Sequence, residues 1–298
     1  MTKAPTPSYL LVSHGSRDPR SQAMMKRLAH LVQQRLGWLA IAQQAYSATA
    51  EPALALSAAA AKPLASNWQP SQSSEIVTTG RLRRQRAAQI TQVPLVETAY
   101  LELGPTALRT QVCQFAQKTQ AAGKAEMRIV PLFLLQGVHV MEDLPAEVAA
   151  ARQQMTEAVS LTLCPHLGSH SGLTHLLSEK AGQTASRAFL LVAHGSRRAG
   201  GNKQVEAIAK QMGATVAYWS TPPSLEAQVV DLMQQGYQRI VILPYFLFAG
   251  TLIDAIMQRT EELAERFPKV AFRLLPPLGA TRELAGLVAD LASRPFEI

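Results

Sequence analysis

Short runs of branched apolar residues, each followed directly by polar residues, recur along the chain. Residues 10–12, 190–192 and 240–243 are continuous apolar runs, typical of strands whose two faces are both covered. Between such runs lie segments with apolar residues at helical spacing, as at Met25, Leu28, Ala29, Val32 and Leu36. This alternation predicts parallel sheets connected by right-handed helical crossovers.

The chain also contains an internal repeat. Tyr9–Arg17 (YLLVSHGSR) recurs as Phe189–Arg197 (FLLVAHGSR), and Ile129–Gly137 (IVPLFLLQG) recurs as Ile242–Gly250 (ILPYFLFAG). A third, shorter pair of blocks follows in the same order. Three matching blocks in one order indicate the duplication of a structural unit. We therefore expect two similar α/β lobes, each with roughly four parallel strands flanked by helices.

The spacing of the repeated blocks sets the expected domain organisation. We expect an N-terminal lobe over residues 1–182 and a C-terminal lobe over residues 183–298. The N-terminal lobe has extra residues, which we place near 47–92, a segment rich in Ala, Ser, Gln and Pro with a basic run at 81–86. Because such a composition buries little surface, we expect a mobile surface insertion there.

Composition and charge narrow the class of protein. The apolar run at 240–250 is interrupted by Pro244 and is too short to span a membrane. The formal net charge of +8 attracts polyanions, but zinc-finger spacing, RNA-binding aromatic motifs and basic helices are not found. We therefore expect neither a membrane nor nucleic acid as partner. Cys113 and Cys164 are isolated in the sequence, as is typical of proteins in a reducing compartment, so we expect a cytoplasmic protein. We also expect a monomer.

Three polar residues of the N-terminal lobe follow the ends of expected strands. His14 comes directly after the first strand, His139 lies just beyond another, and Glu102 ends a third. Because the carboxyl ends of parallel strands meet at one edge, these side chains can converge on a divalent metal such as Fe(II), Co(II), Ni(II) or Zn(II). The residues alone leave other roles open: a strand-tip histidine can serve as a hydrogen-bonding residue, and Glu102 can cap a helix near Pro105.

Other polar residues have weaker patterns. Arg17 and Arg197 follow the two His-Gly-Ser sequences, where either an anion-binding helix start or a solvated charge is expected. His166, His170 and His175 lie near one another in sequence, but glycines interrupt the helical spacing that a pair of ligands would need. The sequence leaves open whether these three histidines deliver metal.

The motifs together resemble those of a known family. His14–Arg17 (HGSR), Tyr100–Glu102 (YLE) and Pro131–Pro145 (PLFLLQGVHVMEDLP) are similar to successive motifs of the CbiX/SirB sirohydrochlorin chelatases. The similarity covers almost the whole chain except the insertion. It implies the chelatase fold, in which two α/β lobes face each other across a cleft. It also implies the insertion of Fe(II) into sirohydrochlorin for siroheme synthesis or, alternatively, of Co(II) for cobalamin synthesis.

The resemblance implies roles for particular residues. His14 and His139 correspond to the paired active-site histidines and Glu102 to the accompanying acid, so these three are the expected catalytic and metal-binding residues. The metal is then a substrate, and no permanently bound cofactor is implied. Sirohydrochlorin is a polycarboxylate, which suits the net charge of +8.

The C-terminal repeat departs from this pattern. It keeps His194 but has Ser220 and Leu252 at the positions of the acid and the second histidine. We therefore expect this lobe to form the opposite wall of the cleft, where His194, Arg197 and Arg198 contact substrate. Arg17 of the N-terminal lobe is expected to bind substrate as well. The histidine-rich tail and cluster-binding cysteines of some cobalt-specific members are not found in this sequence, which favours iron.

Two alternatives from other classes of protein follow from the same residues. A histidine phosphatase would have an arginine immediately before His-Gly, where this chain has Ser13 and Ala193. A non-catalytic carrier of metal or tetrapyrrole would bind sirohydrochlorin without raising the rate of metal insertion.

Overall fold

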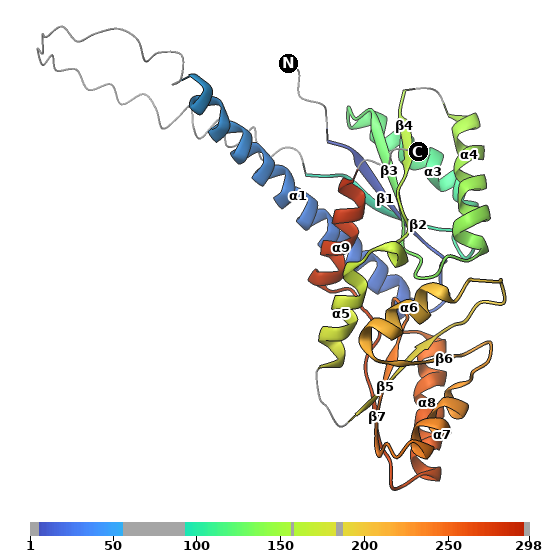
Figure 1. Cartoon of the computed structure of the whole chain (residues 1–298). Helices are drawn as coiled ribbons and strands as arrows, with labels where there is room; N and C mark the ends of the chain where they lie inside the picture. Colours follow the sequence, from blue (N-terminus) through green and yellow to red (C-terminus); the bar gives the residue numbers. More distant parts are fainter. Residues whose placement is uncertain (1–5, 56–92, 156–157, 183–186, 295–298) are drawn as a thin grey trace, which may run out of the picture.

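Two four-stranded parallel sheets form the two lobes of the protein (Figure 1). A computed structural model describes residues 6–55, 93–155, 158–182 and 187–294, with the backbone alone for 43–55. The strand orders are β2-β1-β3-β4 and β6-β5-β7-β8, so one topology occurs twice. Each neighbouring pair of strands is parallel, and the expectation of two parallel α/β lobes is confirmed.

Strands and helices alternate along the first half of the chain. The strands are β1 (Ser8–Ser13), β2 (Val96–Tyr100), β3 (Glu126–Pro131) and β4 (Ser160–Leu163). The helices are α1 (Pro19–Ala55), α3 (Leu108–Ala121), the π-helix η1 (His139–Asp143), α4 (Leu144–Gln154), the 3-10 helix η2 (Leu167–Ser169) and α5 (Gly172–Ala181).

The second half follows the same order with shorter connections. Its strands are β5 (Ala188–Ala193), β6 (Thr215–Tyr218), β7 (Arg239–Pro244) and β8 (Ala271–Leu274). Its helices are α6 (Lys203–Met212), α7 (Leu225–Gln234), α8 (Thr251–Arg266) and α9 (Arg282–Ser293). The register repeats as well, because Leu10 pairs with Ile129 in one sheet and Leu190 pairs with Ile242 in the other.

Each sheet has one face covered by helices of its own half. In the N-terminal lobe, Phe115 of α3 and Leu144 of α4 lie in one buried cluster with Ile129 of β3. In the C-terminal lobe, α7 and α8 cover the equivalent face, with Val229 and Ile256 fully buried. Burial of these apolar side chains on both sheet faces accounts for the continuous apolar runs of the strands.

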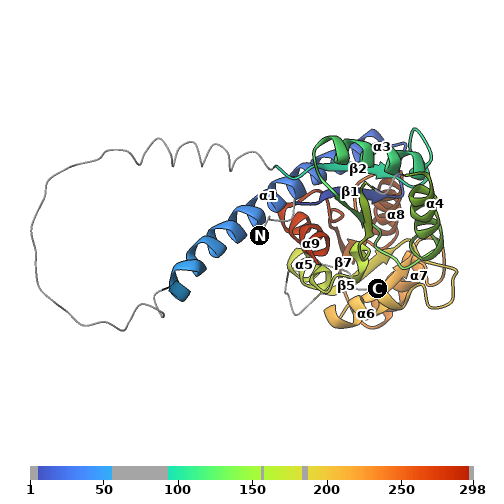
Figure 2. The same ribbon diagram turned by 90° about the horizontal axis from the view of Figure 1, so that it is seen from above.

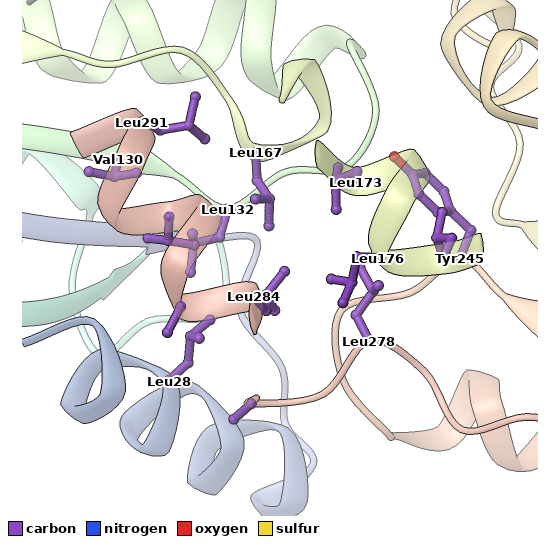
Figure 3. Close-up of a cluster of buried hydrophobic side chains, with 14 of the residues drawn as sticks. Leu28, Val130, Leu132, Leu167, Leu173, Leu176, Tyr245, Leu278, Leu284 and Leu291 are labelled. Atoms are coloured by element: carbon purple, nitrogen blue, oxygen red, sulfur yellow. The ribbon is translucent and has the colours of Figure 1, made fainter. Parts of the chain in front are cut away.

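The other faces of the two sheets share a single core, to which helices from both halves contribute (Figure 3). Helix α9, the last in the chain, packs against α1 and β3, while α5 packs against α6 and β7 (Figures 1 and 2). Hydrogen bonds also join the two halves: Arg128 Nη1 donates to the Ala292 carbonyl at 2.8 Å, and Lys180 Nζ donates to the Pro277 carbonyl at 2.9 Å. Each lobe is therefore completed by a helix from the other half of the sequence.

Helix α1 is much longer than its counterpart α6. It contains the expected helical segment 25–36 and continues to Ala55, so that its end projects away from the lobes (Figure 2). Residues 47–55 of the expected insertion thus continue the helix, and residues 56–92 lie outside the described residues. In the described part of the chain, no helix is long and apolar enough to cross a membrane.

Candidate metal centre

A cavity of about 740 Å³ lies between the lobes, at the carboxyl ends of the central strands. His14, Leu134 and His139 line it from the N-terminal lobe, and His194 and Phe248 line it from the C-terminal lobe. The carboxyl edge of a parallel sheet is the usual place for a ligand in such folds, and this volume is typical of small-molecule pockets. The cavity therefore contains histidines from both repeats between apolar walls.

The position of His14 follows from the turn at the end of β1. Gly15 has φ of 102°, a conformation that side chains disfavour, and a Cβ there would lie 3.0 Å from Leu103. The chain after β2 runs beside this turn, since the Leu101 N–H donates to the Ser13 carbonyl at 2.9 Å and the Glu102 N–H donates to the His14 carbonyl at 3.1 Å. Backbone pairing beyond the strands therefore brings His14 and Glu102 side by side.

His139 completes a group of three. His14 Nδ1 lies 3.5 Å from Glu102 Oε2, and His139 Nδ1 lies 3.6 Å from Glu102 Oε1. The two imidazole ring centroids are 4.8 Å apart. Each of the three residues offers one possible ligand atom, and these three atoms all lie within 4.8 Å of one another. The structure thus brings together the three residues that the sequence predicts as metal ligands.

The donor set suits a borderline divalent ion, which imidazole and carboxylate bind without the tight hold of a thiolate. Two ligand atoms each ~2.1 Å from one ion are at most about 4.2 Å apart, so the widest pair needs a small side-chain adjustment. About half of the His14 and Glu102 side chains is exposed, and 37% of His139, which leaves room for that movement. Glu102 does not cap α3, because the N-cap of that helix is Ala107.

Sequence reasoning missed one acidic residue of the site, Asp143. Its Oδ2 atom lies 2.8 Å from His139 Nδ1, a shorter distance than that from the same nitrogen to Glu102. The spacing of four residues within a helical turn is the signal that would have found it, because such side chains are neighbours on one face.

The equivalent positions in the C-terminal lobe carry no metal-binding set. His194 and Leu252 line the cavity, and the Ser220 hydroxyl donates to the His194 carbonyl at 2.7 Å. Tyr245 lies in the cavity wall; burial raises the pKa of its phenol, and its hydroxyl donates to the Leu134 carbonyl of the other lobe at 3.2 Å. This lobe therefore contributes a wall with one histidine.

The arginines expected to bind substrate occupy different environments. Arg197 lines the cavity, whereas Arg17 and Arg198 are not among the described residues that line it. Arg198 Nη1 instead donates to Glu142 Oε1 of the other lobe at 2.8 Å. Arg17 is exposed.

His166, His170 and His175 do not form a cluster, and among the described residues the only group of three or more potential metal ligands is the one with His14. Burial lowers the pKa of His166, whose Nε2 lies 3.4 Å from Gln204 Oε1. His170 contacts Asp290 at 2.8 Å, and His175 contacts Glu179 at 3.2 Å.

A model of the CbiX family matches residues 69–184 and 188–294. The first match begins after β1, so His14 lies outside it; the structure places β1 between β2 and β3, as β5 lies between β6 and β7. His14 therefore occupies the position in the N-terminal lobe that His194 occupies within the second match.

Similar curated proteins include two from Priestia megaterium. A sirohydrochlorin cobaltochelatase is 22% identical over 219 residues, covering 68% of this chain and 70% of that protein. A sirohydrochlorin ferrochelatase is 24% identical over 185 residues, covering 58% and 68%. Among solved structures, SirB from Bacillus subtilis with Fe3+ aligns with a TM-score of 0.63 at 16% identity over 96% of both chains, which establishes a shared fold.

Proposed function

The chain belongs to the CbiX family, and from that premise we propose that it is a lyase that inserts a divalent metal ion into sirohydrochlorin. The observation that carries the proposal is the convergence of His14, Glu102 and His139 at the edge of the cavity between the lobes. The similarity to proteins named as ferrochelatase and cobaltochelatase supports sirohydrochlorin as the substrate.

In this proposal the metal is a substrate that the three side chains hold before it enters the ring. Two imidazoles and one carboxylate leave coordination positions open, so that ring nitrogens can replace the protein ligands one after another. The partial exposure of all three side chains favours this exchange, because a fully enclosed set would hold the ion too firmly.

Insertion also requires two pyrrole N–H protons to leave the macrocycle. Imidazole is the side chain that both binds such metals and takes up a proton near neutral pH. His14 and His139, whose ring centroids are 4.8 Å apart, would therefore accept these protons as they release the metal. Glu102 Oε2 lies 3.5 Å from His14 Nδ1 and Glu102 Oε1 lies 3.6 Å from His139 Nδ1, so the carboxylate would remain beside both rings as the metal leaves.

The tetrapyrrole would lie between the lobes. Leu134, Leu135, Phe246 and Phe248 line the cavity and would flank the flat ring. His194 and Arg197 line the opposite wall and would contact its carboxylates. Arg198 would serve only once its ion pair with Glu142 is broken. Arg17, which is exposed and is not among the residues that line the cavity, would serve from outside it.

We propose Fe(II) as the physiological metal and Co(II) as the alternative, because imidazole and carboxylate ligands suit both ions. A cytoplasmic location and a monomeric state, both expected from the sequence, complete the proposal.

The test is anaerobic metal insertion by the purified full-length protein, followed by the absorbance change of sirohydrochlorin with Fe(II) and, separately, Co(II). We expect His139→Ala to lose most of the rate, by about 10²–10⁴-fold, as is typical when a proton acceptor is removed. His175→Ala is the matched control, since His175 also contacts a carboxylate four residues later but lies outside the cavity. A wild-type protein that binds sirohydrochlorin without accelerating insertion would be a carrier, and the proposal would fail.

A further inference from the structure

The imidazole of His139 has a carboxylate partner that is not part of the three-residue group. Its Nδ1 lies 2.8 Å from Asp143 Oδ2, within hydrogen-bond distance, and 3.6 Å from Glu102 Oε1, beyond it. The two residues are the first and last of η1, whose wide turn is closed by the Leu144 N–H donating to the His139 carbonyl. Asp143 is therefore the hydrogen-bond partner of this ring.

A carboxylate accepts hydrogen bonds, so the proton of this contact must be on Nδ1 of the imidazole. The lone pair of the neutral ring is then on Nε2. We propose that Asp143 is a positioning residue that fixes the tautomer and the orientation of His139, so that Nε2 is the atom offered to the incoming metal. This inference rests on the proposed function, in which His139 binds the metal.

The internal repeat supports a role linked to the histidine. The positions of His139 and Asp143 correspond to Leu252 and Ile256 in α8 of the C-terminal lobe. Ile256 is fully buried, whereas 46% of the Asp143 side chain is exposed. The lobe that has no histidine here therefore has no acid either, and it uses the second position for its core.

A purely structural role for Asp143 finds no support in its contacts. Asp143 precedes α4 at the N-cap position, but its side chain makes no capping hydrogen bond there, and its backbone is already helical. A half-exposed aspartate that neither caps a helix nor fills the core should be replaceable without unfolding the protein.

The experiment compares Asp143→Ala, Asp143→Asn and the control Glu179→Ala in the full-length protein. Glu179 also pairs with a histidine four residues before it, at 3.2 Å, but on α5 outside the cavity. Two quantities are measured: the affinity for Co(II) alone, from its visible absorption, and the steady-state constants for metal insertion. We expect Asp143→Ala to weaken Co(II) binding about 10- to 100-fold and to lower kcat with little change in KM for sirohydrochlorin.

Asp143→Asn should recover much of both losses, because its amide oxygen accepts the same N–H, and Glu179→Ala should behave as wild type. The inference is overturned if Asp143→Ala binds Co(II) as wild type does, or if the asparagine variant is no better than the alanine variant. His139→Ala separates this from failure of the proposed function: if it inserts metal as fast as wild type, the proposed site itself is wrong.

Discussion

The two repeats place one histidine each at the same position, and replacing each in turn tests where the chemistry occurs. His14 belongs to the group with Glu102 and His139, whereas His194 has Ser220 and Leu252 as its equivalent neighbours. Both histidines are exposed at the ends of central strands. Replacing either with alanine should therefore leave the thermal midpoint nearly unchanged, because substitutions of exposed residues usually change stability by no more than about 0.5 kcal/mol.

The expected kinetic effects differ in kind. His14→Ala removes a metal ligand and a proton acceptor, so kcat should fall about 10²–10⁴-fold, equivalent to about 3–5 kcal/mol in the barrier. His194→Ala removes a wall contact that acts alike before and during the reaction. One exposed hydrogen bond contributes about 0.5–1.5 kcal/mol, so KM should rise about 2- to 12-fold with kcat nearly constant.

The assay is steady-state insertion of Co(II) at varied sirohydrochlorin, with tetrapyrrole binding measured separately by fluorescence quenching. His14→Ala should bind sirohydrochlorin nearly as well as wild type, because the C-terminal wall and the apolar flanks are intact. If His194→Ala abolishes turnover at saturating substrate while His14→Ala remains active, the active centre lies in the other lobe and the reasoning from the repeats is refuted.

Two further predictions concern residues that support the site. A Cβ at Gly168 would collide with the Leu134 carbonyl, so Gly168→Ala should lower the free energy of unfolding in urea by about 3 kcal/mol or more. Gly123 has φ of 69° and open space around it, so the control Gly123→Ala should lower it by only about 1–2 kcal/mol, and equal losses would contradict this prediction. Burial lowers the pKa of His166 below its usual 6.5, so the unfolded chain binds the proton first as pH falls. Stability should therefore fall as the pH drops through about 6.5, where the unfolded chain takes up the proton, and it should fall less in His166→Gln. Identical slopes in the two proteins would show that His166 has no part in the pH dependence.

The repeated strands could be predicted from the sequence because their burial on both faces leaves a local pattern of continuous apolar residues. The convergence of His14, Glu102 and His139 could also be predicted, since parallel strands order their carboxyl ends along one edge. In each of these cases a local signal determined the arrangement.

Arrangements that depend on contacts between distant segments could not be predicted in the same way. The leucines of α9 have ordinary helical spacing, and nothing in that spacing shows that they pack on α1 of the other half. The ion pair between Arg198 and Glu142 joins residues 56 positions apart, and it changes the surroundings of an arginine that we assigned to substrate. Asp143 could have been predicted, because its spacing of four residues from His139 is a local signal.

Helices α5 and α9 each pack on the other half of the chain, and this packing restricts motion of the two lobes relative to each other. A hinge between the two halves would have to pull Leu173 of α5 and Leu284 of α9, both fully buried, out of the common core. Exposing apolar surface costs roughly 25 cal/mol for each Å², so wide opening would resemble partial unfolding. We therefore expect the distance between the two lobes to be set when the chain folds, and the tetrapyrrole to enter a preorganised cavity without domain closure.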